Sequence, residues 1–277
     1  MLIGCHVSIA GGIAEAPLNA AELGCEIFQC FSRSPQGGPA PVLTEDAVEL
    51  FLSRCKEHGL KQWVIHAPYY INFASSEGRT RGNSIRIVRE ELERGTKLQA
   101  AYVMFHPGSS KDVGRDQGIA HVVDGIKKIL DGYEGTTNLL VEISAGAGQV
   151  IGDTFEEVAE IIEKVGHPDL GVCFDTAHAF ASGYDLRDAE HVRETFKNFD
   201  ETVGLDRLKI SHCNDSKVEL NARKDRHEHI GKGFIGRAGF EALFREPRIK
   251  HLNWYLETEH DFVKEDIATL KEIRAAV

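Results

Sequence analysis

The feature that most constrains the fold of this chain is a repeating unit. In each unit, a short apolar, β-branched run is followed by a loop with Gly, Ser or Asn, and then by an amphipathic helical stretch. Eight such units follow one another, with strand candidates at residues 2–5, 26–31, 62–66, 102–106, 139–143, 171–175, 208–212 and 253–257. Helical stretches follow the strands, as at residues 13–23, 46–58, 84–99, 155–165 and 263–276.

Strands that alternate with helices predict a parallel sheet, because parallel neighbours need a crossover connection. Eight units of about 35 residues favour closure into a (β/α)8 TIM barrel, an α/β fold that commonly takes roughly 250 residues. A doubly wound open sheet is the competing architecture. No linker, low-complexity tract or composition break divides the chain, so we expect a single domain over residues 1–277.

The composition limits the kinds of molecule that the protein can bind and the compartment in which it works. The chain has 43 acidic residues against 32 Lys plus Arg, a formal net charge of -11, which argues against wholesale electrostatic binding of nucleic acid or anionic membrane. No apolar run approaches the roughly 20 residues that span a bilayer, and no basic stretch precedes the first apolar residues. The six cysteines form no C-x-x-C pair. We therefore expect a cytoplasmic protein with no membrane partner and with reduced, buried thiols.

Six consecutive strand candidates, the third to the eighth, each end in a side chain that can bind a metal ion. These residues are His66, His106, Glu142, Asp175, His212 and Glu257. Three more such residues lie in the loops beyond strand ends, namely His178, Asp225 and His227. A lone histidine after a strand is more often an ordinary hydrogen-bonded or surface residue. Recurrence at one phase of six units instead predicts a single pocket, because the strand ends of a barrel meet at one rim.

The chemistry of these side chains indicates a metal centre. Imidazole nitrogen and carboxylate oxygen together favour Zn, Mn or Fe over Mg and Ca, and the lack of thiolates favours a catalytic site. Nine ligands at three or four per ion predict two or three ions, with one bridging carboxylate. Clustered divalent ions assist phosphoryl transfer above all, so phosphodiester hydrolysis is the predicted reaction. A sugar isomerase with two metals on a barrel is the alternative.

Sequence blocks along nearly the whole chain resemble endonuclease IV, the zinc-dependent apurinic/apyrimidinic (AP) endonuclease family. The blocks read IGCHVSIAGG, HAPYYIN, FHPGSS, VEISAGAG, GVCFDTAHAFASGYD, SHCNDSK, DRHEHIGKG and LET. HxNDSK followed by DRHxxIGxG is highly specific to that family.

The resemblance implies a DNA-repair hydrolase of the deoxyribonuclease IV type with three Zn²⁺ ions per chain. Its implied substrate is double-stranded DNA with abasic sites or blocked 3′ ends. In-line attack of hydroxide would cut the bond 5′ to an abasic site, leaving a 3′-hydroxyl and a 5′-deoxyribose phosphate. A 3′-end-cleaning phosphodiesterase activity is also expected.

Matched motif by motif, the resemblance divides the nine candidates among three zinc ions. One ion would bind His66, His106 and Glu142. Glu142 would bridge to a second ion, which Asp175, His212 and Glu257 also hold, and the third would bind His178, Asp225 and His227. Glu142 and Glu257 are the implied catalytic residues. Glu259 faces the same side of its strand as Glu257 and is the alternative ligand there.

The expected DNA contacts are Tyr69, Tyr70, Gln36, Arg33, Arg226 and Asn214. The two tyrosines stand where the family inserts bulky side chains into the duplex at the lesion, and packing of a rim loop is the alternative. Arg33 and Arg226 would bind phosphates, while Asn214 would touch a phosphate or fix a ligand. Gln36 and the two glycines after it replace an inserting arginine and a tryptophan-bearing segment of the family. We expect hydrolysis to survive this departure, while lesion affinity, the degree of DNA bending, or the preference between an internal abasic site and a blocked 3′ end would differ.

Two rival functions make different predictions. A metal-dependent sugar isomerase or epimerase on a similar barrel would turn over a ketose and fail to incise abasic DNA. A DNA-damage-binding protein without activity would bind such DNA in the presence of zinc and leave it intact, but the complete ligand set argues against it. We expect a monomer, because one rim of the barrel would face the DNA.

Overall fold

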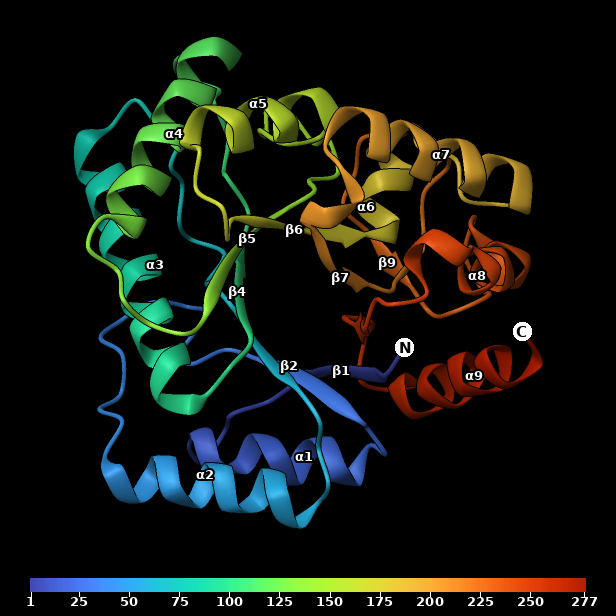
Figure 1. Cartoon of the computed structure of the whole chain (residues 1–277), viewed down its shortest axis with the longest axis horizontal. Coiled ribbons are helices and arrows are strands. Elements are labelled where there is room, and N and C mark those ends of the chain that lie inside the picture. Colours follow the sequence, from blue (N-terminus) through green and yellow to red (C-terminus); the bar gives the residue numbers. More distant parts are fainter.

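The computed structural model describes all 277 residues and contains eight parallel strands closed into a barrel (Figure 1). The barrel strands are β1 (Ile3–Val7), β2 (Ile27–Cys30), β3 (Trp63–His66), β4 (Tyr102–Phe105), β5 (Asn138–Glu142), β6 (Gly171–Asp175), β7 (Leu208–His212) and β10 (Trp254–Leu256). Each strand pairs with its neighbours in sequence, and β10 pairs with β1 to close the ring. The predicted TIM barrel is therefore confirmed, and the open sheet is excluded.

Helices surround the barrel on its outside (Figure 1). They are α1 (Ala16–Glu22), α2 (Glu45–Glu57), α3 (Gly78–Leu98), α4 (Arg115–Leu130), α5 (Phe155–Val165), α6 (Thr176–Ala181), α7 (Ala189–Thr202), α8 (Gly236–Arg245) and α9 (Val263–Ala276). Three short 3-10 helices are η1 (Ile13–Glu15), η2 (Leu205–Arg207) and η3 (Pro247–Ile249). The last helix packs beside β1, where Arg274 donates to the backbone carbonyl of Met1 and pairs with Glu26, so the two ends of the chain meet. No helix has the length and apolar character needed to cross a membrane.

Local sequence signals explain where the helices begin and end. In α5, the hydroxyl of Thr154 accepts from the backbone N–H of Glu157 at the start, and Gly166 ends the helix in the left-handed conformation. Asp188 caps α7 in the same way, accepting from two backbone N–H groups. The buried face of α5 contains Val158, Ile161 and Ile162, at the spacing of an amphipathic helix.

Two apolar layers hold the barrel together. The interior layer takes one residue from each of seven strands, namely Ile27, Val64, Met104, Leu140, Cys173, Ile210 and Tyr255. The larger layer packs the outer faces of the strands against the helices. All six cysteines are buried within these layers or beside them, as expected from their scattered positions.

Some elements differ from the expected ranges. A two-stranded hairpin of β8 (Asp215–Ser216) and β9 (His227–Glu228) follows β7, and strands of two residues are too short to show an alternating pattern in the sequence. Helix α3 begins at residue 78 rather than 84, because its polar first turns lack apolar spacing. Strands β4 and β10 end one residue before His106 and Glu257, which therefore lie just past the barrel strands.

Gly4 provides a test of the packing between β1 and β2. A Cβ atom at this position would lie 1.6 Å from the backbone oxygen of Ile27, its register partner. We expect Gly4→Ala to reduce the free energy of unfolding by at least the roughly 1–3 kcal/mol typical of overpacked cores. Gly82→Ala is the control, because Gly82 lies in α3 with open space around its Cβ position, and the change should stabilise by about 0.5–1 kcal/mol. Urea unfolding measures both, and equal stabilities of the two variants would contradict the packing.

Candidate metal centre

A ring of polar residues lies directly above the interior layer of the barrel. Side chains along a strand alternate between two faces, so the residue two positions beyond an interior residue also faces inward. Leu140 thus leads to Glu142, and Ile210 leads to His212. The eight residues at this position of the barrel are His6, Gln29, His66, His106, Glu142, Asp175, His212 and Glu257. Six of the eight are the predicted strand-end ligands.

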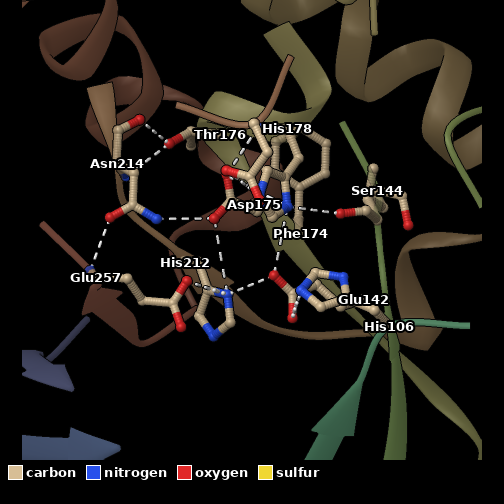
Figure 2. Close-up of polar contacts among 12 residues, drawn as sticks. His106, Glu142, Ser144, Phe174, Asp175, Thr176, His178, His212, Asn214 and Glu257 are labelled. Atoms are coloured by element: carbon tan, nitrogen blue, oxygen red, sulfur yellow. Dashed lines mark hydrogen bonds and ion pairs between the residues drawn. The ribbon is translucent and has the colours of Figure 1, made fainter. Parts of the chain in front are cut away.

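Glu142, at the end of β5, is fully buried at the centre of the site (Figure 2). Its Oε2 lies 3.0 Å from Nε2 of His66 and 3.5 Å from Nε2 of His106. Its Oε1 lies 2.9 Å from Nδ1 of His212 and 3.4 Å from Nδ1 of His178. One carboxylate therefore connects imidazoles from four different parts of the rim.

A second group of side chains shares Glu142 with the first. Nδ1 of His212 lies 3.2 Å from Oε2 of Glu257 and 3.7 Å from Oδ2 of Asp175. Asn214 fixes both of these acidic residues, because its Nδ2 donates to Oδ2 of Asp175 (2.8 Å) and its Oδ1 accepts from the backbone N–H of Glu257 (2.7 Å) (Figure 2). One ligand atom from each of Glu142, Asp175, His212 and Glu257 lies within 4.8 Å of the others.

The third group lies where α6 meets the β8–β9 hairpin. Nε2 of His178 and Nε2 of His227 are 3.3 Å apart, and Oδ1 of Asp225 lies 3.3 Å from each. Asp175 also reaches this group, with its Oδ2 3.8 Å from Nε2 of His227. The structure thus brings all nine predicted ligands together. It also places Asp175 between the second and third groups, which the sequence did not indicate.

The orientation of the imidazoles fits bound metal ions. Nδ1 of His66 donates to the backbone carbonyl of Ala67 (2.6 Å), and Nδ1 of His178 donates to that of Ile143 (2.9 Å). With Nδ1 protonated, the lone pair on Nε2 points into the site, and for His66 it faces Glu142. At 3.0 Å, Nε2 of His66 and the Glu142 oxygen repel each other unless a proton or a metal cation lies between them. Divalent ions with nitrogen and oxygen ligands supply such a cation.

The pKa values of the buried carboxylates and imidazoles also favour the binding of metal ions. Burial raises the pKa of Glu142, but the imidazoles of His106 and His212 outweigh it and hold that pKa well below its ordinary value. Burial also opposes the charged form of Glu257, yet His212 and its neighbours lower the pKa of Glu257 to about 2. For His212, burial lowers the pKa, but the surrounding anionic groups raise it well above its ordinary value. The carboxylates are therefore held in the anionic form that binds metal ions, and a bound cation would take the place of the proton on Nδ1 of His212.

The site opens to solvent through a cavity of about 390 Å³. Tyr69 and Tyr70 line it together with His106, His178 and Asp225. The tyrosines are 62% and 40% exposed, and the ring of Tyr69 lies 5.3 Å from that of His66, centroid to centroid. A larger hollow, of about 890 Å³, lies over α2 and is lined by none of the nine candidate ligands.

Two of the residues expected to contact DNA, Arg33 and Asn214, are buried in the structure. Arg33 is only 2% exposed, because its guanidinium forms ion pairs with Glu90 and Glu91 of α3. Asn214 is fully buried beneath the ligands that it orients, so it cannot reach a phosphate outside. The sequence could not reveal these partners, because α3 follows Arg33 by more than 40 residues.

Three other residues named from the sequence, Gln36, Arg226 and Glu259, are exposed to solvent. Gln36 and Arg226 are exposed, and their contacts with DNA stay a prediction. Glu259 is 74% exposed and pairs with Lys217. Glu257, rather than Glu259, therefore faces the metal-ligand candidates.

His6 and Gln29 also belong to the site, although sequence reasoning missed them. They are register partners on β1 and β2 and occupy the first two positions of the polar ring. The sequence did contain an indication of their role. Both are polar residues at the same position along their strands as the six metal-ligand candidates on the later strands. Burial lowers the pKa of His6 to about 3, so its imidazole is neutral.

Asp215 is a further residue that the sequence did not single out. Its buried carboxylate accepts hydrogen bonds from the backbone N–H groups of Ser216, Gly231, Gly233, Ile235 and Gly236. Gly233 allows this close approach, since a Cβ there would lie 2.5 Å from Oδ1 of Asp215. One carboxylate thus organises the loop that follows Asp225 and His227.

The fold is a (β/α)8 barrel in which His, Asp and Glu side chains that could hold metal ions gather at the carboxyl ends of the strands, as in a metal-dependent barrel enzyme. Comparison with known proteins agrees, since residues 17–273 match the family described as "Xylose isomerase-like TIM barrel". A protein named "Probable endonuclease 4" from Carboxydothermus hydrogenoformans is 38% identical over 277 residues, which cover 100% of this chain and 98% of the relative. The crystal structure of endonuclease IV from Thermus thermophilus superposes with a TM-score of 0.86 at 35% identity, covering 99% of this chain and 98% of that chain.

The chain belongs to the endonuclease IV family, a family of nucleases. A D-tagatose 3-epimerase-like protein also superposes, with a TM-score of 0.75 at 21% identity over 100% of this chain and 96% of that chain. At that identity the likeness shows the fold alone.

The buried position of Arg33 can be tested by stability. Arg33→Ala leaves Glu91 buried without its cationic partner, and we expect the free energy of unfolding to fall by about 3–5 kcal/mol. Arg226→Ala removes an exposed arginine from the same rim and should change stability by no more than about 0.5 kcal/mol. Urea unfolding compares the two variants. An Arg33→Ala protein as stable as Arg226→Ala would contradict a buried, paired role for Arg33.

Proposed function

We propose that this protein is a zinc-dependent AP endonuclease of DNA repair. It would hydrolyse the phosphodiester bond 5′ to an abasic site in double-stranded DNA, leaving a 3′-hydroxyl and a 5′-deoxyribose phosphate. The observation that carries the proposal is the buried carboxylate of Glu142, shared between imidazoles of two ligand groups in a chain of the endonuclease IV family.

Three zinc ions per chain are part of this proposal. His66, His106 and Glu142 would hold one ion; Glu142, Asp175, His212 and Glu257 the second; and Asp175 or Asp225, with His178 and His227, the third. When bound, the ions would lower the pKa of the attacking water and neutralise charge on the phosphoryl group and the departing 3′ oxygen. Nitrogen and oxygen donors suit zinc, and Mn and Fe accept the same donors, so the metal in a preparation would also reflect supply.

The residues of the chain would hold this arrangement in place rather than react covalently. Glu142 is fixed between imidazoles on both of its oxygens, and Asn214 fixes two of the acidic ligands. Cys173 and Cys213 lie beside the site, but burial raises the pKa of both thiols, so neither is a nucleophile. Hydrolysis by water is the chemistry that these residues support.

The rim supports DNA as the substrate. Tyr69 and Tyr70 are exposed aromatic side chains at the mouth of the cavity, suited to hold a kinked duplex at a lesion. Arg226 and Gln36 are exposed on two loops that follow barrel strands, and both would contact the DNA backbone. The cavity volume of about 390 Å³ suits a nucleotide-sized group.

The same site would also clean blocked 3′ ends, because the attacked phosphate has the same chemistry at a chain end. We further expect the protein to act as a monomer in the cytoplasm, with one rim against the DNA. The two glycines after Gln36, both with positive φ, have no side chains to contact the duplex, so binding of the lesion would be weaker than in family members with bulky residues there.

Two alternatives have less support. A sugar isomerase or epimerase shares the barrel, but the epimerase-like protein at 21% identity shares only the fold. A non-catalytic DNA-damage-binding protein would have no need of nine candidate ligand side chains gathered in three adjoining groups. Turnover of a ketose would favour the first, and binding of abasic DNA without cleavage in zinc would favour the second.

Replacement of Glu142 tests the proposed function. A labelled duplex with one tetrahydrofuran abasic analogue should be incised by the wild-type protein with zinc, and Glu142→Gln should slow incision at least about 100-fold, because it removes the shared anion. Glu259→Gln is the control, since this exposed glutamate lies near the same rim and should cut like the wild type. Equal rates of incision by the wild type and Glu142→Gln would contradict the assignment of Glu142 as a shared metal ligand. No incision by the wild type would reject the endonuclease function.

The role of the tyrosines can be separated from catalysis. We expect Tyr69→Ala and Tyr70→Ala each to weaken binding of the abasic duplex by about 1–3 kcal/mol, the usual contribution of one aromatic stack. Hydrolysis of bis(p-nitrophenyl) phosphate should change little, because this small diester has no duplex to hold open. Equal losses in both assays would indicate that the tyrosines only pack the loop.

A further inference from the structure

Gln29 is a fully buried polar residue in the middle of an otherwise apolar strand. Its side-chain amide contacts three other side chains of the polar ring. Oε1 lies 2.7 Å from Nε2 of His212, and Nε2 lies 2.6 Å from Oε1 of Glu257 and 3.0 Å from Nδ1 of His6. All three hydrogen bonds of the Gln29 side chain are therefore directed at the metal-ligand candidates His212 and Glu257 or at His6 on β1.

The partners of Gln29 fix which way its amide faces. A carboxylate only accepts hydrogen bonds, so the NH2 group must face Glu257, and its second hydrogen points to Nδ1 of His6, which is then the acceptor. The amide oxygen must then face His212, where it accepts from Nε2–H. His212 is thereby held as the tautomer that has a proton on Nε2 and a lone pair on Nδ1.

This arrangement distinguishes His212 from the other histidines of the site. His66 and His178 each donate from Nδ1 to a backbone carbonyl and present Nε2. His212 presents Nδ1 toward Glu142 at 2.9 Å and Glu257 at 3.2 Å, and a side chain rather than the backbone orients it. Orientation by a side chain can be removed by one substitution.

We propose that Gln29 is the positioning residue of the second ion site, the one formed by Glu142, Asp175, His212 and Glu257. It sets the tautomer of His212 and the rotation of the Glu257 carboxylate at the same time, with His6 as the acceptor that completes its hydrogen bonds. This inference rests on the metal centre of the proposed function. Loss of an outer-shell partner of this kind typically weakens metal affinity about 10–100-fold.

The experiment compares two glutamine-to-methionine variants of the full chain, one at the fully buried Gln29 and one at the half-buried Gln62. Gln29→Met keeps the length of the side chain and removes its hydrogen bonds. Gln62→Met is the matched control, since Gln62 makes comparable bonds to Asn253 and Tyr255 at the opposite end of the barrel. Each protein is saturated with zinc and desalted, and zinc per chain and the rate of zinc release to a chromophoric chelator are measured.

We expect the wild type and Gln62→Met to retain the same number of ions. Gln29→Met should release one of its ions about 10–100-fold faster, or lose it on desalting, and keep the others. Retention and release equal to the wild type would overturn the role of Gln29. A wild type that retains no metal would instead reject the metal centre of the proposed function, so the two failures are distinguishable.

A second measurement does not depend on the folding of a variant. In the zinc-loaded wild type, ¹⁵N NMR of the histidine side chains should show His212 protonated at Nε2 only, and His66 and His178 protonated at Nδ1 only. Protonation of His212 at Nδ1, with Nε2 on the metal, would overturn the proposal.

Discussion

The buried charge of Glu142 is the interaction on which the rest of the site depends. A carboxylate without access to water is strongly destabilised unless cations or hydrogen-bond donors surround it. Here imidazoles face both of its oxygens, from β3, from β7 and from the segments after β4 and β6. The requirement to compensate one anion therefore draws together segments that are far apart in the sequence, and the same arrangement forms the ligand groups.

The barrel provides this convergence through the alternation of its strands. Apolar side chains fill the interior, and the residues two positions later form the polar ring above them. The residues that stabilise the barrel and the residues of the candidate metal site thus lie in adjacent layers of the same strands. The loops beyond the ring add His178, Asp225 and His227, and the buried carboxylate of Asp215 holds the loop that follows the last two.

Much of this could be predicted from the sequence, because strand phase is a local property. The repeat of strand and helix predicted the barrel, and the six strand-end residues predicted the ligand set. Contacts between distant segments were the part that the sequence could not show. The sequence predicted Arg33 to be an exposed cation on the rim of the barrel, whereas in the structure it forms a buried ion pair with Glu91. His6 and Gln29 had the right phase but are not a typical metal-binding pair, and the two-residue strands of the hairpin leave no pattern.

The most direct test of the account is an anomalous diffraction measurement at the zinc edge on crystals of the protein purified with zinc. The account predicts three peaks around Glu142: one beside His66, one beside His212 and one between His178 and His227. A single peak, or peaks outside the polar ring, would contradict the claim that the ring and its loops form one shared metal centre.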